Sequence, residues 1–555
     1  MLIPVTKEKA VLLALAISML LSIFSMNTSA QTTNATPTPD HITLTWTQDP
    51  MTTQTVTWRT DLTVNSGMVE YAKQTGQGSF PGNARTVTET PSKFDTNTGT
   101  INIHSTTITG LEPGVTYVYR VGGGKNWSAV NTFTTEAAGT DAFKFLVFGD
   151  SQSGSSADPN YAPWQTNVQN AYKANPDAKF IVNIGDNVET GQNYIHWENW
   201  FAAAKGVIDH IPEMSVQGNH ETFLPLGSGQ SRKPIYWETQ FKLPQNGAEG
   251  LLGQTYSYEY GNAHFIVLDS QEDEEAPVSG DILAAQKTWL ENDLKNTTKT
   301  WKIVFFHKAP YYNKATRSNE AIKLAFCPIF DKYHVDLVFN GHDHSVSRTY
   351  PMYNDSPVNR ISKGTVYYVA GRSGNKAYTD LSQKVWDAFF YDPQDQPNYI
   401  NCMVNGNMLT LNATKADGTL IDSYVMDKNA DTKTATPYYN NTRMVIYGNM
   451  LQQSTLPTDP QKVNDKWYVP ARAFAQFFGG SASMSGSVLT VSLGGTTADI
   501  PVNGLQATVG GKSVKLPDKL LIQKSNTFIS ADDIKAVFGF SWKYDATTNM
   551  IFFTK

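Results

Sequence analysis

The order of apolar and polar positions changes twice along the chain. From residue 41 to residue 137, short segments alternate apolar and polar residues with a period of two, as in Ile42, Leu44 and Trp46, and Gly or Pro separates the segments. Alternation of this kind predicts strands with one buried face. Several such strands with regular turns predict a small antiparallel β-sandwich over residues 41–137.

From residue 141 to residue 428, strand-like apolar runs alternate with amphipathic stretches of helix length. The predicted strands occupy residues 143–149, 179–185, 213–218, 256–260, 264–269, 301–307, 335–341 and 365–370. The predicted helices occupy residues 164–173, 197–207, 281–294 and 319–333. Strands that alternate with helices predict a layered α/β domain.

The last region, residues 438–555, contains an internal repeat. Residues 467–479 align with residues 527–539, and each copy reads as a strand, a short helix that ends at Gly, and then a hairpin. The hairpins are predicted at Val488–Leu493 and Met550–Thr554. Short repeats usually bury their apolar faces against each other, which predicts one small α+β domain.

The first thirty residues have the pattern of a secretory signal. Lys7 and Lys9 precede an apolar run over residues 10–24, and small residues lead to Ala30. A retained membrane anchor is the alternative, but the run is shorter than the roughly 20 residues that a spanning helix needs. We therefore expect cleavage after Ala30, a linker over residues 31–40, and a secreted or cell-surface protein without a transmembrane anchor.

Composition limits the remaining possibilities. A length of 555 residues predicts several domains, and the net charge of -6 argues against a nucleic-acid-binding surface. Two cysteines, Cys327 and Cys402, are too few for a disulfide framework or a thiolate zinc cluster, and the sequence leaves open whether they pair.

Chemistry-bearing residues follow five of the predicted strands in the middle domain. The carboxyl ends of strands are where open α/β sheets present ligands. The residues concerned are Asp150, Gln152, Asp186, Glu189, Asn219, His220, His307, His342 and His344. Each block alone is a weak signal, because Gly-Asp is commonly a turn and a single His is commonly structural.

Together these blocks predict a metal centre. Oxygen and imidazole donors without thiolates suit Fe, Zn or Mn. Six donors are too many for one tetrahedral ion and natural for two. A shared carboxylate would hold two divalent or trivalent ions about 3.5–4 Å apart, a spacing that suits in-line phosphoryl displacement.

In this order the blocks resemble those of the calcineurin-like metallophosphoesterases, and the preceding sandwich makes the arrangement similar to purple acid phosphatases. Residues 111–120 resemble the turn and strand of a fibronectin type III-like module. Residues 438–555 resemble the N-terminal domain of copper amine oxidases, an accessory of exported bacterial proteins, without a cluster of copper ligands. The resemblance implies a four-layer α/β/β/α catalytic domain between two smaller domains.

The resemblance also implies roles for single residues. Asp150 and His344 would bind the first ion, and Asp186 would bridge the two ions. The second ion would be bound by Asn219, His307 and His342.

Two positions depart from the family pattern. Glu189 stands where purple acid phosphatases have a Tyr that binds ferric iron, and Gln152 stands where many other members have a His ligand. Gln152 is therefore expected to bind weakly, and ferric iron is in doubt. By analogy with the protein phosphatases, Glu189 would orient His220 and raise its pKa; a solvated loop carboxylate is the alternative.

These residues predict an exported acid phosphatase of purple acid phosphatase type that hydrolyses phosphomonoesters. A metal-activated hydroxide would attack phosphorus, and His220 would protonate the leaving oxygen. Arg348 would contact phosphate, and Tyr311 and Tyr312 would wall the substrate pocket; a surface Arg and ordinary packing are the alternatives.

Two other functions stay open at this point. The same metal pair would serve a phosphodiesterase or nucleotidase. A function of another class is a surface binding protein with a vestigial site. Cell-wall association through the last domain is a further hypothesis.

Overall fold

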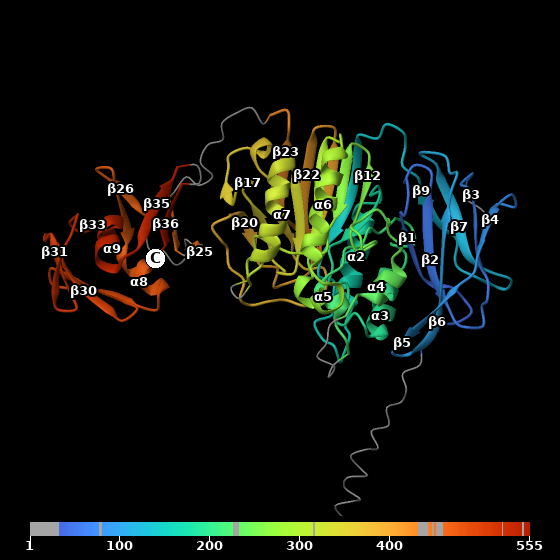
Figure 1. Cartoon of the computed structure of the whole chain (residues 1–555), viewed down its shortest axis with the longest axis horizontal. Helices are drawn as coiled ribbons and strands as arrows, with labels where there is room; N and C mark the ends of the chain where they lie inside the picture. Colours follow the sequence, from blue (N-terminus) through green and yellow to red (C-terminus); the bar gives the residue numbers. More distant parts are fainter. Residues whose placement is uncertain are drawn as a thin grey trace, which may run out of the picture.

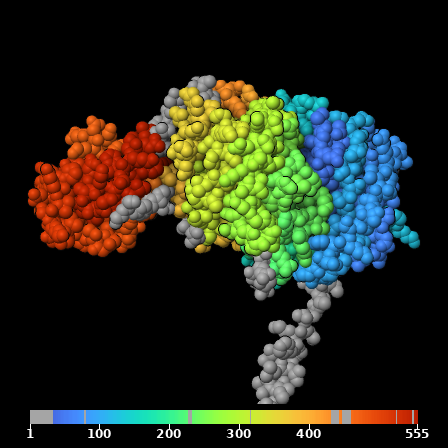
Figure 2. Space-filling model, in the orientation of Figure 1, coloured from blue at the N-terminus to red at the C-terminus, as the bar shows by residue number. Residues whose placement is uncertain are grey.

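The computed structural model describes residues 33–76, 80–225, 232–314, 317–430, 442–446, 449–450, 459–523, 525–546 and 549–554. Figure 1 shows three bodies in a row, in the order of the sequence, and Figure 2 shows the same view with all atoms. The predicted signal segment lies outside the described residues. Within these ranges, no helix is both long enough and apolar enough to cross a bilayer.

The first body is the predicted β-sandwich. One sheet has the order β1-β2-β6-β5, and the other has the order β4-β3-β7-β8 with β9 also on β7. The bounds are β1 Asp40–Thr45, β2 Gln54–Thr60, β3 Gly67–Lys73, β4 Arg85–Glu89, β5 Ser92–Thr96, β6 Gly99–Ile108, β7 Thr116–Gly123, β8 Asn126–Trp127 and β9 Asn131–Thr134.

The sandwich is joined to the central domain by buried contacts. Leu44 lies in the sandwich core, but Trp46 packs against Phe180 and Tyr260 of the central domain, with 5.5 Å between the ring centroids in each pair. The guanidinium of Arg59 donates to Glu198 at 2.9 Å across the same interface. The first two domains therefore share an apolar and an ionic interface.

The central domain is built on two large sheets, and β17 (Met352–Tyr353) and β18 (Ser356–Pro357) form a separate two-stranded sheet. The first has the order β11-β10-β21-β22-β23 and the second β12-β13-β14-β15-β19-β16-β20. The bounds of the first are β10 Ala142–Phe148, β11 Ile181–Asn183, β21 Asn398–Asn405, β22 Met408–Lys415 and β23 Leu420–Asp427. The bounds of the second are β12 Tyr256–Tyr260, β13 Ala263–Val267, β14 Trp301–Lys308, β15 Leu337–Gly341, β16 Val346–Thr349, β19 Val366–Ala370 and β20 Asp387–Tyr391.

Helices cover the outer faces of both sheets. Helix α2 (Ala162–Ala174) contacts β21 and lies beside α3 (Tyr194–Ala204), whereas α6 (Ile282–Asn296) and α7 (Glu320–Tyr333) lie together on the second sheet (Figure 1). Ile303 and Phe305 of β14 pack in the core between the sheets, and Val304 and Phe306 pack under α6 and α7. A strand buried on both faces explains the continuous apolar runs, and the predicted four-layer fold is confirmed.

Residues 213–218 differ from their predicted form. They do not form a strand of a sheet; they make two isolated bridges to the neighbouring segment, Ile181 with Glu213 and Ile184 with Val216. Glu213 is fully buried, and among the described residues neither carboxylate oxygen has a hydrogen-bond partner. Burial raises the pKa of Glu213 from 4.5 to about 8.

This buried carboxyl makes stability fall as pH rises. Between pH 4.5 and 8 the unfolded chain ionises Glu213 while the folded chain keeps the proton, so the free energy of unfolding decreases by on the order of 5 kcal/mol over this window. Glu213→Gln should remove the loss. Denaturant unfolding of both proteins, followed by tryptophan fluorescence at pH 5 and pH 8, measures the difference; parallel pH profiles would contradict it.

The third body is built around the two repeats. Strand β27 (Lys466–Pro470) leads into α8 (Ala471–Phe477), and β34 (Asn526–Ser530) leads into α9 (Ala531–Phe538). The two repeat strands pair in an antiparallel manner, and both copies contribute to one core. The remaining strands are β24 Arg443–Ile446, β25 Asn449–Met450, β26 Gln461–Val463, β28 Ser481–Ser485, β29 Val488–Leu493, β30 Thr496–Pro501, β31 Gln506–Val509, β32 Lys512–Lys515, β33 Leu521–Gln523, β35 Ser541–Asp545 and β36 Met550–Thr554.

The two cysteines do not form a disulfide. Cys327 lies in α7 and Cys402 in β21, and both are buried as free thiols. Burial raises the pKa of each thiol, which keeps them protonated and unreactive.

Candidate metal centre

The predicted ligands lie where strands of both sheets end. Asp150 follows β10, Asp186 follows β11, His307 is the next-to-last residue of β14, and His342 follows β15. Four of the ligands have a left-handed backbone: φ is 55° at Asp150, 51° at Asp186, 72° at His342 and 62° at His344. Side-chain-bearing residues rarely adopt this conformation, and it concentrates at functional sites.

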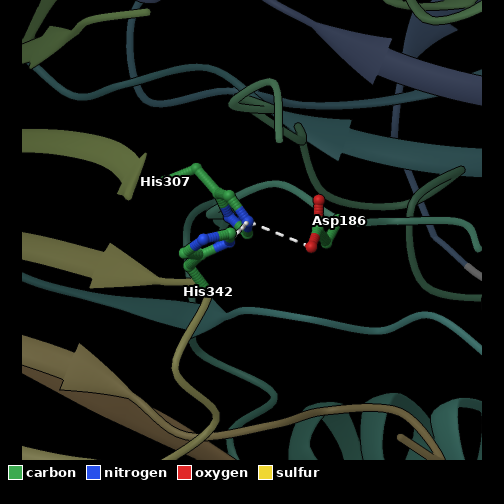
Figure 3. Close-up of side chains that lie close together, drawn as sticks. All are labelled: Asp186, His307 and His342. Carbon is green, nitrogen blue, oxygen red and sulfur yellow. Dashed lines mark hydrogen bonds and ion pairs between the residues drawn. The ribbon is translucent and has the colours of Figure 1, made fainter. Parts of the chain in front are cut away.

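The side chains converge into one cluster (Figure 3). His307 Nε2 lies 3.0 Å from Asp186 Oδ2 and 3.2 Å from His342 Nδ1. Beside this group, His344 Nε2 lies 3.2 Å from Asp150 Oδ1, and Asp150 Oδ1 lies 3.9 Å from His307 Nε2. The cluster thus has two poles: Asp186 with His307 and His342 forms one, and Asp150 with His344 forms the other. The Asp150 carboxylate lies near His307 and so connects the two poles.

Glycines and one buried carboxylate let the loops meet. A Cβ on Gly341 would lie 2.7 Å from Asp150 Oδ2, and one on Gly218 would lie 2.2 Å from the main-chain nitrogen of Asp186. Glu221 accepts hydrogen bonds from the backbone N–H groups of Asp186 at 2.9 Å and Gly218 at 2.7 Å. Glu221 therefore fixes the loop of the predicted bridging carboxylate to the loop of Asn219.

Three histidines are oriented in the same way. The Nδ1–H of His307 donates to the carbonyl of Ile184 at 2.8 Å, and that of His344 donates to the carbonyl of Lys376 at 2.9 Å. His220 donates in the same manner to the carbonyl of Glu189 at 2.6 Å. These bonds leave each Nε2 directed toward the cluster, as is usual for imidazoles that bind a metal or a substrate.

The cluster fits cations. Gln152 Oε1, Asn219 Oδ1 and His344 Nε2 are buried and have no hydrogen-bond partner within the described part of the chain. Buried polar atoms are rarely left unpartnered, so a bound group is expected there. Burial alone would lower the pKa of His307, but Asp186 and Asp150 raise it to about 9. The site therefore attracts positive charge and offers unused donor atoms.

The sequence matches three known families. Residues 39–135 match the purple acid phosphatase N-terminal domain, residues 143–346 match the calcineurin-like phosphoesterases, and residues 450–553 match the copper amine oxidase N-terminal domain. Residues 143–346 are therefore similar to the calcineurin-like phosphoesterase domain. The resemblance inferred from the ligand blocks, including both flanking domains, is confirmed.

Individual relatives agree with this assignment. The chain is 28% identical over 370 residues to an uncharacterised protein of Mycobacterium tuberculosis, and the match covers 59% of this chain and 68% of that protein. It is 27% identical over 373 residues to acid phosphatase type 7 of Mus musculus, and this match covers 61% of this chain and 78% of that protein. The structure of a purple acid phosphatase from yellow lupin seeds aligns with a TM-score of 0.57 at 20% identity, over 70% of this chain and 74% of that one, which shows the shared fold.

Gln152 reaches the cluster of predicted ligands. Its amide nitrogen donates to Asp186 Oδ2 at 3.2 Å, and its unpartnered Oε1 is the donor atom that would meet an ion. The structure thus places Gln152 beside the predicted ligands, and its role as a weak oxygen donor stays a prediction.

Glu189 contacts His220 differently from the prediction. The main-chain carbonyl of Glu189, not its carboxylate, orients the imidazole, and the carboxylate lies 3.8 Å from His220 Nδ1. The carboxylate instead accepts from Gly154 N at 2.9 Å and pairs with Lys376 Nζ at 3.1 Å. Burial lowers the pKa of His220, and although Asp186 and Glu189 act to raise it, burial prevails together with Lys376.

Arg348 is not brought to the cluster. Its Nε donates to Asp422 Oδ2 at 3.1 Å, and its guanidinium stacks 3.9 Å from the ring centroid of Tyr424. Asp422 and Tyr424 belong to β23, so Arg348 links the two sheets. The predicted phosphate contact is replaced by a structural ion pair, because Arg348 lies in β16 with its side chain directed toward the other sheet.

Arg348→Ala should therefore lower stability and leave catalysis intact. The nearly buried Asp422 would lose its charged partner, which costs about 3 kcal/mol. Urea unfolding measures this loss, and kcat/KM of the variant should stay within about twofold of the parent. A large fall in kcat/KM without a loss of stability would restore the phosphate-binding role.

The two tyrosines after His307 belong to the packing around α7. Tyr311 is buried, with its ring 4.6 Å from Tyr367 and 5.7 Å from Trp386. Tyr312 is half-buried and lies 5.6 Å from the same Trp386. Burial raises the pKa of Tyr311. The structure therefore assigns Tyr311 to the core, not to a pocket wall, because its buried ring packs against Tyr367 and Trp386.

Two residues at the site were not predicted. Lys376 Nζ lies 2.9 Å from His220 Nε2, and the ring of Tyr378 lies 4.4 Å from that of His344. Both follow β19, and their signal was present: the segment Gly371–Tyr378 follows a predicted strand like the ligand blocks do. It was overlooked because it contains neither His nor a carboxylate.

Proposed function

We propose that this protein is an exported, metal-dependent phosphatase that hydrolyses phosphomonoesters. The observation that carries the proposal is the convergence of Asp186, His307 and His342 with the unpartnered donor atoms of Gln152, Asn219 and His344. A buried set of oxygen and imidazole donors without thiolates supports Fe, Zn or Mn. The two poles of the cluster support two ions.

The chain's own residues would then act as follows. Asp150 and His344 would hold one ion, Asn219, His307 and His342 would hold the other, and Asp186 would contribute to both. When bound, such ions supply Lewis acidity that neutralises phosphoryl oxygens and activates water. Glu221 holds the two loops together, and the carbonyl of Glu189 orients His220. Protonated His220 would donate its Nε2 proton to the leaving oxygen, in place of the hydrogen bond that the neutral imidazole accepts there from Lys376.

Glu189 is not proposed as a ligand. Its carboxylate oxygens are used by Gly154 and Lys376, so the position that binds ferric iron in purple acid phosphatases has another task here. We expect no charge-transfer colour in the purified protein and a preference for divalent ions. Elemental analysis together with a visible spectrum tests this.

The assay that tests the function compares two substrates. The purified protein is treated with a chelator, Fe, Zn or Mn is titrated back, and hydrolysis of p-nitrophenyl phosphate and bis-p-nitrophenyl phosphate is measured. A higher kcat/KM for the monoester supports the phosphatase. A higher value for the diester would assign a phosphodiesterase at the same site, and no hydrolysis with any metal would favour a binding protein with a vestigial site.

Export and cell-wall association are separate proposals. Export is supported by the signal pattern up to Ala30, and the N-terminal sequence of protein recovered from the medium tests cleavage there. Attachment through the last domain is tested by cell-wall fractionation of the full chain against a chain that stops at residue 428.

A further inference from the structure

A lysine that lies outside the predicted ligand blocks reaches the metal centre from the loop after β19. The ammonium of Lys376 donates to His220 Nε2 at 2.9 Å and pairs with Glu189 Oε1 at 3.1 Å. His220 Nε2 in turn lies 3.8 Å from Asp186 Oδ2. A single atom, His220 Nε2, therefore lies within 4 Å of both the Lys376 ammonium and the Asp186 carboxylate.

The loop that carries Lys376 is fixed to the first ligand block. The backbone N–H of Ser373 donates to the carbonyl of Gly149 at 2.7 Å, and that of Asn375 donates to the carbonyl of Gln152 at 3.1 Å. A Cβ on Gly374 would lie 2.4 Å from the Gln152 carbonyl, so this close approach requires glycine. The ammonium is thus held in place before any substrate binds, which lowers the entropic cost of using it.

The ammonium retains the capacity to bind an anion. A lysine has three N–H donors, and within the described ranges the hydrogen bonds of Lys376 Nζ use two of them, to Glu189 and His220. The side chain of Lys376 is 20% exposed, whereas that of Glu189 is 10% exposed. The side chain of Lys376 is therefore more exposed to solvent than that of its partner.

We propose that Lys376 binds a non-bridging oxygen of the substrate's phosphoryl group and thereby makes the site select phosphomonoesters over phosphodiesters. The inference rests on the proposed phosphatase function, which it makes more specific. A monoester dianion presents three non-bridging oxygens, and a fixed cation beside the ions compensates the additional negative charge. A diester carries an ester group and one negative charge less, so it gains less from the same ammonium.

The experiment uses the metal-loaded full chain with three substitutions. Lys376→Met keeps the length and removes the charge, and Lys376→Arg keeps the charge. Lys332→Met is the control, since Lys332 is 56% exposed and its ion pair among the described residues is with Glu291, at 3.1 Å. A charged hydrogen bond is worth about 10- to 100-fold. Lys376→Met should lower kcat/KM for p-nitrophenyl phosphate by this factor and that for bis-p-nitrophenyl phosphate by less than about threefold.

A binding measurement separates this inference from the proposed function. Calorimetric titration with inorganic phosphate should show a Kd at least about tenfold weaker in Lys376→Met, with little change for dimethyl phosphate, partial recovery in Lys376→Arg and no change in Lys332→Met. Metal content should be equal in all four proteins. If the parent hydrolyses neither ester but binds phosphate through Lys376, the phosphatase fails and the anion site stands.

Other results would overturn the inference. Equal losses for both esters with unchanged phosphate affinity would mean that Lys376 only supports Glu189 and His220. Absence of phosphate binding by the parent protein, or an unchanged monoester-to-diester ratio in Lys376→Met, would remove the selective role as well.

Discussion

Asp186→Ala is expected to abolish the dinuclear centre. The carboxylate of Asp186 lies within 3.0 Å of His307 Nε2 and 3.2 Å of Gln152 Nε2, and its other oxygen accepts from the backbone of His220 at 2.9 Å. Removal of the group between the two poles leaves neither ion a complete ligand set. We expect metal content to fall from two ions per chain to one or none, and hydrolysis to fall by at least about 10³-fold.

The measurements are elemental analysis and the kcat of the metal-saturated proteins. Asp269→Asn is a matched control, because Asp269 is also a fully buried carboxyl beyond a strand end, but its carboxylate accepts from the side chain of Gln254 and the backbone of Gln271. That variant should keep both ions. Two ions per chain in Asp186→Ala would contradict the bridging role and, with it, the proposed mechanism.

His220→Ala is expected to slow turnover by about 10²–10⁴-fold with metal content unchanged. His220 holds its Nδ1–H on the Glu189 carbonyl at 2.6 Å, and its Nε2 faces the site beside Lys376. A proton donor matters most for a poor leaving group. The loss should therefore be larger with phenyl phosphate than with p-nitrophenyl phosphate, whose leaving group needs less protonation.

This dependence on the leaving group separates a donor from a merely structural residue. His334→Asn is the control, since His334 is an exposed histidine whose φ of 52° asparagine tolerates. It should leave both rates unchanged. Equal losses with both substrates in His220→Ala, or no loss, would remove His220 from the acid role; a loss of metal would make it a ligand.

Local rules predicted the strands and helices well, and candidate ligands that they marked lie together in the structure. The apolar runs that end at Gly149, Gly185, Phe306 and Gly341 become strands buried on both faces, and parallel strands place their carboxyl ends at one edge. That is why ligands far apart in the sequence, such as Asp150 and His344, could be recognised together. Their chemistry depends on residue type and on position after a strand, and both can be predicted from the amino-acid sequence.

The same rules were less successful for residues whose role depends on the direction in which the side chain points. Arg348 and Tyr311 each lie a few residues after a ligand, yet Arg348 pairs with Asp422 across the sheets and Tyr311 packs on Tyr367. Proximity along the chain does not fix the side of a strand from which a side chain points. Glu189 is a related case: its main-chain carbonyl, not its carboxylate, orients His220, and the carboxylate pairs with Lys376 instead.

The sequence by itself determined the three domains, the layered fold and the predicted ligand set, because periodicity and donor chemistry are local properties. Only the tertiary structure showed that Lys376 reaches His220 and that the backbone of Glu189 orients it. These contacts join loops after different strands, and their partners are set by which strands become neighbours. Strand order is a property of the packed sheets, so no pattern within a single segment reveals it.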